Sequence, residues 1–177
     1  MNETSIAFNA KIVLLGDAST GKTSSIHRFI DEKFQSRYQA TIGVDILEKK
    51  IEFDGKLVKL DFWDLAGQTL FANLRKKFYK GAIGAILVFD VTNENSFKNL
   101  DKWIQEAETN RSKDIHYLLV ANKIDLDHIR SITTEQIQIK ADSIPNLIGY
   151  FETSALTGEN IENAFKTIAE HIVKKSE

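Results

Sequence analysis

The 177-residue sequence contains no cysteine and only one proline, Pro145. Without cysteine the chain can form no disulfide, thiolate nucleophile, cysteine-ligated zinc site or prenylated C-terminus. Repeats, low-complexity tracts and linker-like segments are also lacking. We therefore expect one domain over residues 1–177, with its core at about residues 10–174.

Long apolar runs and an excess of charge of one sign are lacking too. No apolar stretch reaches the roughly 18–20 residues needed to span a bilayer, and residues 1–10 do not resemble a signal peptide. The formal net charge is −2 without a long basic run, which argues against nucleic acid as a partner. We expect a cytoplasmic protein, with peripheral membrane association left open but no lipidation cysteine in this chain.

Unbroken apolar segments alternate along the chain with segments of helical periodicity. Asp54 and Gly55 separate two strand-like segments, and an Asp-Gly pair is typical of a hairpin turn. Apolar strands alternating with helices indicate an α/β fold with helices on both faces of a mostly parallel sheet. The hairpin adds one antiparallel edge strand to this six-stranded sheet. The expected strands are residues 11–15, 44–53, 56–63, 85–89, 117–121 and 150–153, and the expected helices are 22–31, 93–109, 133–143 and 160–174.

Residues 16–23 have the pattern G-x-x-x-x-G-K-T, between an expected strand and an expected helix. The backbone N–H groups of such a loop, with the helix N-terminus, bind phosphate oxygens. Lys22 would reach the β- and γ-phosphates, and the Thr23 hydroxyl would ligate Mg²⁺. Alone, this motif predicts only a nucleoside triphosphate. The candidate phosphate-binding residues are Asp17, Ala18, Ser19, Thr20, Gly21, Lys22, Thr23 and Ser24.

A second polar segment, residues 64–68, follows the hairpin's second strand. Asp64 can hold the coordination shell of Mg²⁺, and Gly67 lets its backbone N–H approach a γ-phosphate. Gln68 could orient the attacking water. Taken alone, the segment is somewhat more typical of an ordinary turn after a strand, so this interpretation depends on the phosphate loop.

Asn122, Lys123 and Asp125 follow the strand expected at residues 117–121. Guanine presents two adjacent donors, N1–H and the exocyclic amine, and the carboxylate of Asp125 can accept both. Adenine would leave that carboxylate unpaired, which is the basis of strong discrimination in comparable sites. Asn122 can tie this loop to the phosphate loop, and the stem of Lys123 can lie over the base plane.

Residues 153–155 close the next expected strand. Ser154 could brace the base-binding loop, and the backbone N–H of Ala155 could donate to guanine O6. By itself this triplet is more typical of an ordinary polar strand end.

In order and spacing, these motifs resemble the small GTPases of the Ras superfamily over residues 10–174. The resemblance implies a P-loop NTPase fold of the small G-domain type. It also implies a switch that binds GTP or GDP with Mg²⁺ and slowly hydrolyses GTP. Thr41 would contact Mg²⁺ and the γ-phosphate and act in catalysis with Lys22 and Gln68, while Phe34 would pack against the guanine. The implied metal ligands are Thr23, Thr41 and Asp64.

Four segments resemble the Rab branch in particular, at residues 42–46, 59–63, 78–82 and 89–92. This resemblance implies a role in membrane traffic or a related regulatory process. It further implies that loops near residues 35–46 and 67–80 contact an effector, an exchange factor and a GTPase-activating protein.

Three departures from the family pattern leave an alternative function open. Thr69 stands where the family usually has glutamate, and Ala18 occupies a position where bulk can obstruct hydrolysis. Leu156 replaces the usual lysine, although it can still pack against the base or the ribose. The alternative is a scaffold that binds GTP or GDP but hydrolyses little. A P-loop kinase or ATPase is disfavoured, because the N-K-x-D pattern at residues 122–125 fits guanine.

Overall fold

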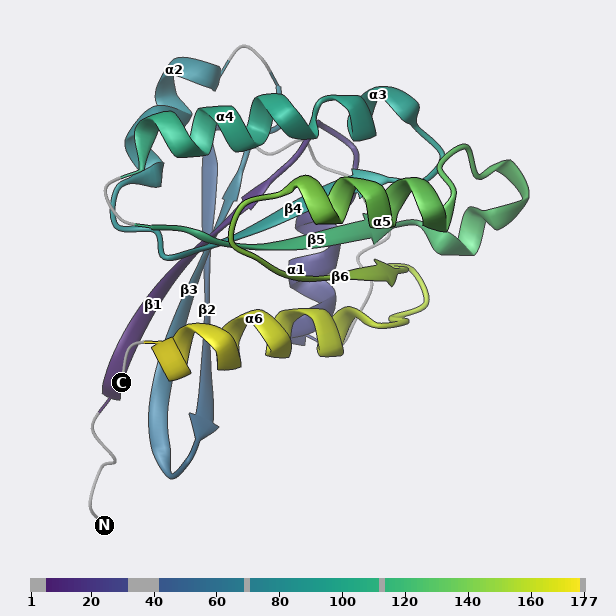
Figure 1. Cartoon of the computed structure of the whole chain (residues 1–177). Helices are drawn as coiled ribbons and strands as arrows, with labels where there is room; N and C mark the ends of the chain where they lie inside the picture. Colours follow the sequence, from purple (N-terminus) through teal and green to yellow (C-terminus); the bar gives the residue numbers. More distant parts are fainter. Residues whose placement is uncertain (1–5, 32–41, 69–70, 112–113, 176–177) are drawn as a thin grey trace.

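The computed structural model describes residues 6–31, 42–68, 71–111 and 114–175. Six strands form one sheet in the order β2-β3-β1-β4-β5-β6 (Figure 1). Only the β2–β3 pair is antiparallel, so the predicted mostly parallel sheet with one antiparallel edge strand is confirmed. The strands are β1 (Ile6–Leu15), β2 (Val44–Phe53), β3 (Lys56–Leu65), β4 (Gly84–Asp90), β5 (His116–Asn122) and β6 (Leu147–Thr153).

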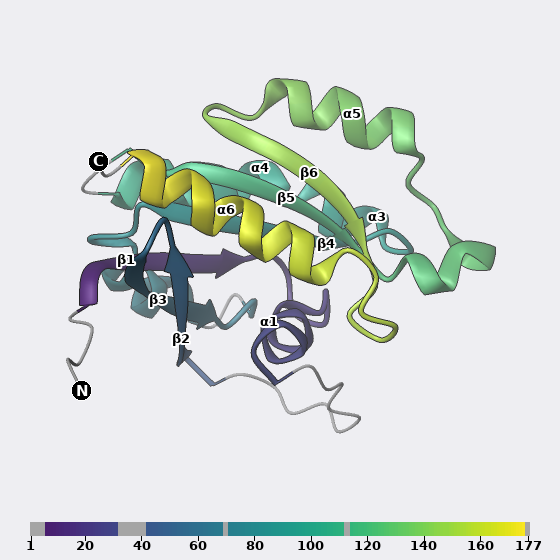
Figure 2. The ribbon, with the colours of Figure 1, turned by 90° about the horizontal axis from the view of Figure 1, so that it is seen from below.

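Helices cover both faces of the sheet, as Figure 2 shows from below. α1 (Lys22–Asp31) and α6 (Ile161–Lys175) pack on one face. α3 (Glu94–Lys98), α4 (Leu100–Asn110) and α5 (Thr134–Ser143) pack on the other. Shorter helical segments are α2 (Ala72–Arg75), η2 (Lys76–Tyr79) and η3 (Ile124–Ile129). None of the helices in the described parts of the chain is long and apolar enough to cross a bilayer.

The apolar strands are buried on both sides because successive side chains point to opposite faces of the sheet. In β1, Ile12 and Leu14 enter the core below α1 and α6, whereas Val13 and Leu15 enter the core below α4. All four are fully buried. A continuous apolar run is therefore what this position in the sheet requires.

The local turn and capping signals act as their residue types suggest. Asp54 and Gly55 both adopt positive φ, at 47° and 72°, and close the β2–β3 hairpin. Thr133 and Gln136 form a reciprocal capping box at the start of α5.

The prediction of one continuous helix at residues 93–109 was wrong in one respect, because the structure has two helices there, α3 and α4. The division falls at Asn99, whose ψ of −6° departs from the helical value. The Asn99 side chain makes no capping hydrogen bond to α4 and donates to the Asp17 carboxylate. β1 and β6 also begin earlier than expected, since β1 already pairs with β3 at Ile6 and β6 with β5 at Leu147.

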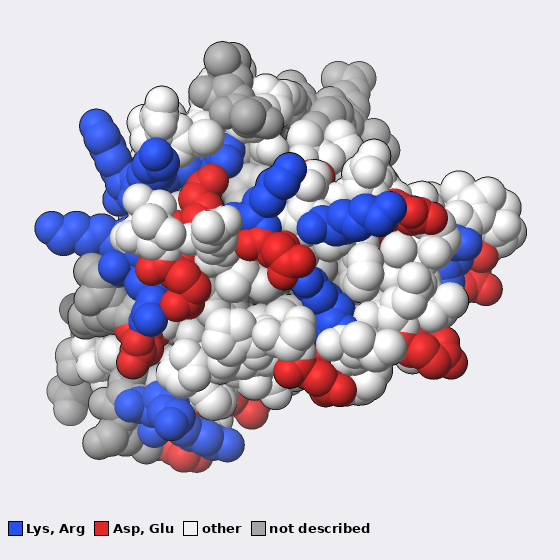
Figure 3. Space-filling view, turned by 45° about the horizontal axis from the view of Figure 1, so that its top comes forward, with Lys and Arg blue, Asp and Glu red and all other residues white. Residues whose placement is uncertain are grey.

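Figure 3 shows one face of the molecule, on which basic and acidic side chains are interspersed. Several of the charges around the helices are paired, for example Lys140 with Asp101 at 2.5 Å and Lys98 with Glu94 at 2.9 Å. No large field of one sign dominates the face shown.

Candidate functional site

The motif-bearing loops all leave the carboxyl ends of parallel strands, at one edge of the sheet. The phosphate loop (residues 16–23) follows β1, residues 66–68 follow β3, and the base-binding loops follow β5 and β6. In open α/β sheets this edge is where ligands bind. The topology therefore gathers motifs that lie as far apart in the sequence as residues 16–23 and 153–155.

The phosphate loop is so closely packed that two of its glycines have no room for a side chain. Gly16 and Gly21 adopt φ of 142° and 96°. A Cβ at Gly16 would lie 2.1 Å from the Val88 carbonyl oxygen, and one at Gly21 would lie 2.1 Å from Asn122 Nδ2. Glycine is thus required at both positions for conformational and steric reasons.

Lys22 folds back across this loop and is only 6% exposed. Its ammonium group donates to the carbonyl oxygens of Gly16 at 2.8 Å and Asp17 at 2.9 Å. Burial lowers the pKa of Lys22 to about 8, against the opposing effect of Asp64 and Asp17, and the charge of Arg75 lowers it further. A cation this desolvated is stabilised by any anion that enters the loop.

The end of β3 lies against the phosphate loop. The Thr23 hydroxyl at the start of α1 donates to the carboxylate of fully buried Asp64. A Cβ added to Gly67 would come within 2.3 Å of Ala18 N and 2.5 Å of the Asp17 carbonyl carbon. Gln68 follows with an exposed side chain. The structure thus brings the predicted residues of the first and second motifs together.

The side chain of Asp17 has a position that the sequence did not predict. Its carboxylate accepts from Asn99 Nδ2 at 2.7 Å and from Trp103 Nε1 at 2.8 Å. The phosphate loop is thereby fastened to the start of α4. The signal in the sequence was only an acidic residue inside the loop and a tryptophan about 86 positions later, which no short-range spacing connects.

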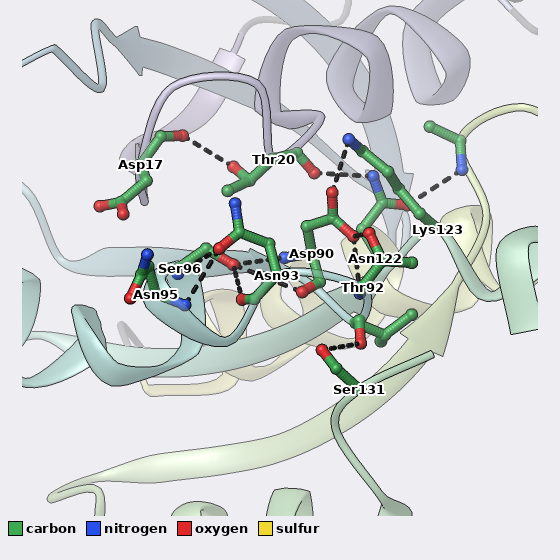
Figure 4. Close-up of polar contacts among 12 residues, drawn as sticks. Asp17, Thr20, Asp90, Thr92, Asn93, Asn95, Ser96, Asn122, Lys123 and Ser131 are labelled. Carbon is green, nitrogen blue, oxygen red and sulfur yellow. Dashed lines mark hydrogen bonds and ion pairs between the residues drawn. The ribbon is translucent and has the colours of Figure 1, made fainter. Parts of the chain in front are cut away.

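Asn122 ties three loops together from the end of β5 (Figure 4). Its Nδ2 donates to the Thr20 carbonyl oxygen at 2.9 Å. Its Oδ1 accepts from the Thr153 hydroxyl and from the Ala155 N–H, each at 3.1 Å. The side chain is 1% exposed. The predicted link to the phosphate loop is present, whereas the Ala155 N–H, expected to donate to a base, donates to Asn122.

The exposed Asp125 carboxylate is oriented by the neighbouring loop, since it accepts from the Ser154 hydroxyl at 2.6 Å. Ser154 in turn accepts from the Thr157 N–H at 3.1 Å and so closes its own loop. Ser154 therefore braces the Asp125 loop, as the sequence suggested. Leu156, just beyond, is 51% exposed.

Lys123 has an unexpected partner. It adopts φ of 70° and forms an ion pair with Asp90 at 2.7 Å. Asp90 ends β4, is 6% exposed, and also accepts from the N–H and the hydroxyl of Thr92 (Figure 4). The acidic residue that ends the apolar strand was the available signal, and it was missed.

Two predicted site residues, Phe34 and Thr41, lie outside the described residues, and their assigned roles stay predictions. Thr69, a departure from the family pattern, lies outside them too.

Comparisons with known proteins agree with this arrangement. The model of the Ras family matches residues 11–174. The chain is 41% identical to Ras-related protein Rab-8A of Gallus gallus over 165 residues, which are 93% of this chain and 79% of that protein. It is 39% identical to Ras-related protein Rab-10 of Diplobatis ommata (94% of this chain, 82% of that protein) and 39% identical to Ras-related protein Rab-13 of Rattus norvegicus (94% and 81%). The chain therefore belongs to the Ras family of small GTP-binding GTPases and is Rab-like within it.

Proposed function

We propose that this chain is a molecular switch that binds GTP or GDP with Mg²⁺ and slowly hydrolyses GTP. The observation that carries the proposal is the buried Asn122, whose side chain joins the phosphate loop to the loop of Ala155. A link of this kind holds a triphosphate site and a base site at a fixed separation. Such coupling is what a nucleoside triphosphate requires of its binding site.

In this proposal the phosphates lie in the loop of residues 17–24. The backbone N–H groups and the N-terminus of α1 would bind their oxygens. The buried Lys22 would exchange its two carbonyl acceptors, Gly16 and Asp17, for the β- and γ-phosphates. An ion pair between the desolvated Lys22 ammonium group and the anionic phosphates favours nucleotide binding.

Thr23, Thr41 and Asp64 would hold Mg²⁺, since hydroxyl and carboxylate oxygens are the ligands this ion prefers. The contact between Thr23 and Asp64 in the structure fits a shared metal position. Within the described residues no three or more His, Cys, Asp or Glu side chains gather into a metal site, so phosphate oxygens and water would complete the shell. When bound, the ion would neutralise charge that develops on the β- and γ-phosphates.

The guanine would be recognised by Asp125, held in place by the Ser154 hydroxyl. Lys123, anchored on Asp90, would lay its stem along the base, and Phe34 and Leu156 would add apolar contacts. The Ala155 N–H donates to Asn122 Oδ1 in the structure. It could donate to guanine O6 only by sharing its hydrogen bond with Asn122 or by giving that hydrogen bond up.

Catalysis would consist of positioning and electrostatics, with Gln68 orienting the attacking water and Lys22 and Thr41 stabilising charge. Intrinsic turnover should then be slow, on the order of 10⁻⁴–10⁻³ s⁻¹, and a partner could raise it by up to roughly 10⁵. Loss of the γ-phosphate would relax the loops near residues 35–46 and 67–80. These loops would bind effectors and regulators, with exposed Ile42, Ile46 and Leu74 as contacts, in membrane traffic or a related process.

The test is to identify the nucleotide that copurifies with the protein and to follow γ-phosphate release from loaded GTP with Mg²⁺. Guanine nucleotide with slow release, abolished in Gln68→Leu, is the expected result. Asp125→Asn should shift preference from guanine toward xanthine, which offers one donor and one acceptor at this edge. Guanine nucleotide without any release would favour the scaffold alternative, and adenine nucleotide or no binding would overturn the proposal.

A further inference from the structure

Arg75 is a buried arginine beside the candidate site that no sequence motif predicted. It ends α2, is 4% exposed, and its charge acts on Lys22 of the phosphate loop. A guanidinium carries five N–H donors in a fixed plane, so its partners define its orientation closely.

One edge of this guanidinium is anchored on α4. Nε and Nη2 donate to the two carboxylate oxygens of Glu106 at 2.9 and 3.0 Å, a bidentate ion pair. Glu106 also accepts from the hydroxyl of fully buried Tyr79 at 2.8 Å. Burial and the neighbouring Glu106 raise the pKa of Tyr79, so this hydroxyl stays protonated and keeps donating. The face of the guanidinium lies 4.5 Å from the ring of Trp103, which itself donates to Asp17 in the phosphate loop.

The other edge reaches the backbone on both sides of Gly67. Nη1 donates to the carbonyl oxygen of Ala66 at 3.0 Å and to that of Gln68 at 2.7 Å. One nitrogen therefore holds the carbonyl of the Ala66–Gly67 peptide and, beyond Gly67, the carbonyl of Gln68. An arginine that served only to join α2 to α4 would have no need of these carbonyls.

The direction of the Gly67 N–H follows from peptide geometry. The structure contains no cis peptide bond in the described residues, and in a trans peptide the C=O and the N–H point in opposite directions. Since the Ala66 carbonyl points at Arg75, the Gly67 N–H of the same peptide points away from Arg75. Turning this peptide over would remove a hydrogen bond from a buried guanidinium, which is costly.

We infer that Arg75 is a positioning residue that sets the orientation of the Gly67 peptide and thereby tunes discrimination between GTP and GDP. The inference rests on the proposed function together with the expectation from the sequence that the Gly67 N–H contacts the γ-phosphate. Only GTP carries that phosphate, so the contribution of Arg75 appears in GTP binding and hydrolysis but not in GDP binding. The Glu106–Tyr79 pair holds Arg75 in place, and Trp103 connects it to the phosphate loop.

The experiment compares the affinities of the full chain and its variants for GDP and for a non-hydrolysable GTP analogue, both with Mg²⁺. For Arg75→Ala we expect GDP affinity within about 3-fold of wild type. We expect GTP-analogue affinity to fall by about 10- to 100-fold, the value of a hydrogen bond to a charged group. Single-turnover phosphate release should fall as well. Arg75→Lys, which keeps the charge but cannot make the bidentate pair and hold both carbonyls, should lie between.

Arg111→Ala is the matched control, because Arg111 also pairs with an α4 carboxylate, Glu108 at 2.8 Å, but its second ion-pair partner is Asp114 and not the Gly67 segment. It should leave both affinities unchanged. If Arg75→Ala does not fold, Glu106→Gln weakens the same anchor with little change of shape and should lower the GTP-to-GDP affinity ratio in the same direction.

Parallel loss of both affinities, or an unchanged ratio in a folded variant, would overturn the inference and leave the proposed function standing. A wild-type chain that binds no guanine nucleotide would overturn both.

Discussion

Removing the side chain of Asn122 should cost more stability than its size suggests. Asn122→Ala leaves three groups without their partner, the Thr20 carbonyl oxygen, the Thr153 hydroxyl and the Ala155 N–H. A buried polar group left unsatisfied costs about 1–3 kcal/mol. The Thr153 hydroxyl can rotate and water can enter the space left by the side chain, so we expect a total of about 3 kcal/mol. Domains typically have about 5–15 kcal/mol in all.

The loss should be measured by urea unfolding of nucleotide-free protein, because a bound nucleotide would add its own stabilisation. For a chain of this size about 3 kcal/mol corresponds to a Tm lower by roughly 6–12 °C. Asn122→Asp is the sharper variant. It keeps an oxygen for Ala155 and Thr153 but replaces the donor that faces the Thr20 carbonyl with a second oxygen, so the loss should be similar.

The control is Asn110→Ala, whose side chain makes a single, partly buried hydrogen bond to the Glu106 carbonyl oxygen at 2.7 Å. We expect it to cost about 1 kcal/mol or less. If Asn122→Ala costs no more than this control, the three loops are not joined through Asn122. The argument for a site of fixed geometry would then fail.

Three further variants probe other contacts. Gly67→Ala should weaken GTP binding more than GDP binding. The added Cβ would lie within 2.6 Å of backbone atoms of the phosphate loop, so residue 67 would have to move away from the expected γ-phosphate position. Equal affinities for the variant and wild type would contradict this packing. Asp17→Ala should lower the unfolding free energy by about 1–3 kcal/mol and change the fluorescence of Trp103, which loses its acceptor; an unchanged emission spectrum would argue against the contact. Burial and neighbouring His116 lower the pKa of His171 below 6.5, so the unfolded chain binds more protons there and stability should fall as pH drops through that value. His171→Gln should flatten this pH dependence of Tm. An unchanged slope would show that groups other than His171 cause the pH dependence.

The parts of the fold that the sequence predicted well are those set by local patterns. The apolar run at residues 11–15, the Asp54-Gly55 turn and the helix at 22–31 depend on neighbours in the sequence, and each has its expected form. The phosphate and base motifs could be placed at strand ends for the same reason. The division of the helix at Asn99 was missed; the side chain of this residue donates to Asp17, 82 residues away, a contact that no local pattern indicates.

The contacts missed in the site share one property, which is that each joins side chains brought together only by the sheet topology. Lys123 meets Asp90 because β4 and β5 are neighbours in register, with Asp90 directly opposite Asn122. Arg75, at the end of α2, meets Glu106 because η2, which follows directly, packs against α4.

These missed contacts also explain what the motifs alone do not. The motif residues supply the groups that would contact a nucleotide. Their positions are held by hydrogen bonds to residues that belong to none of these motifs. Asp17 fastens the phosphate loop to Trp103, and Arg75 fastens the Gly67 segment to Glu106, so both segments share one support in α4. If a partner or a nucleotide displaces the Gly67 segment, Arg75 is therefore disturbed. Arg75 stacks on Trp103, whose indole N–H holds Asp17 of the phosphate loop. In this chain, α4 therefore links the two segments in addition to their direct packing at Gly67.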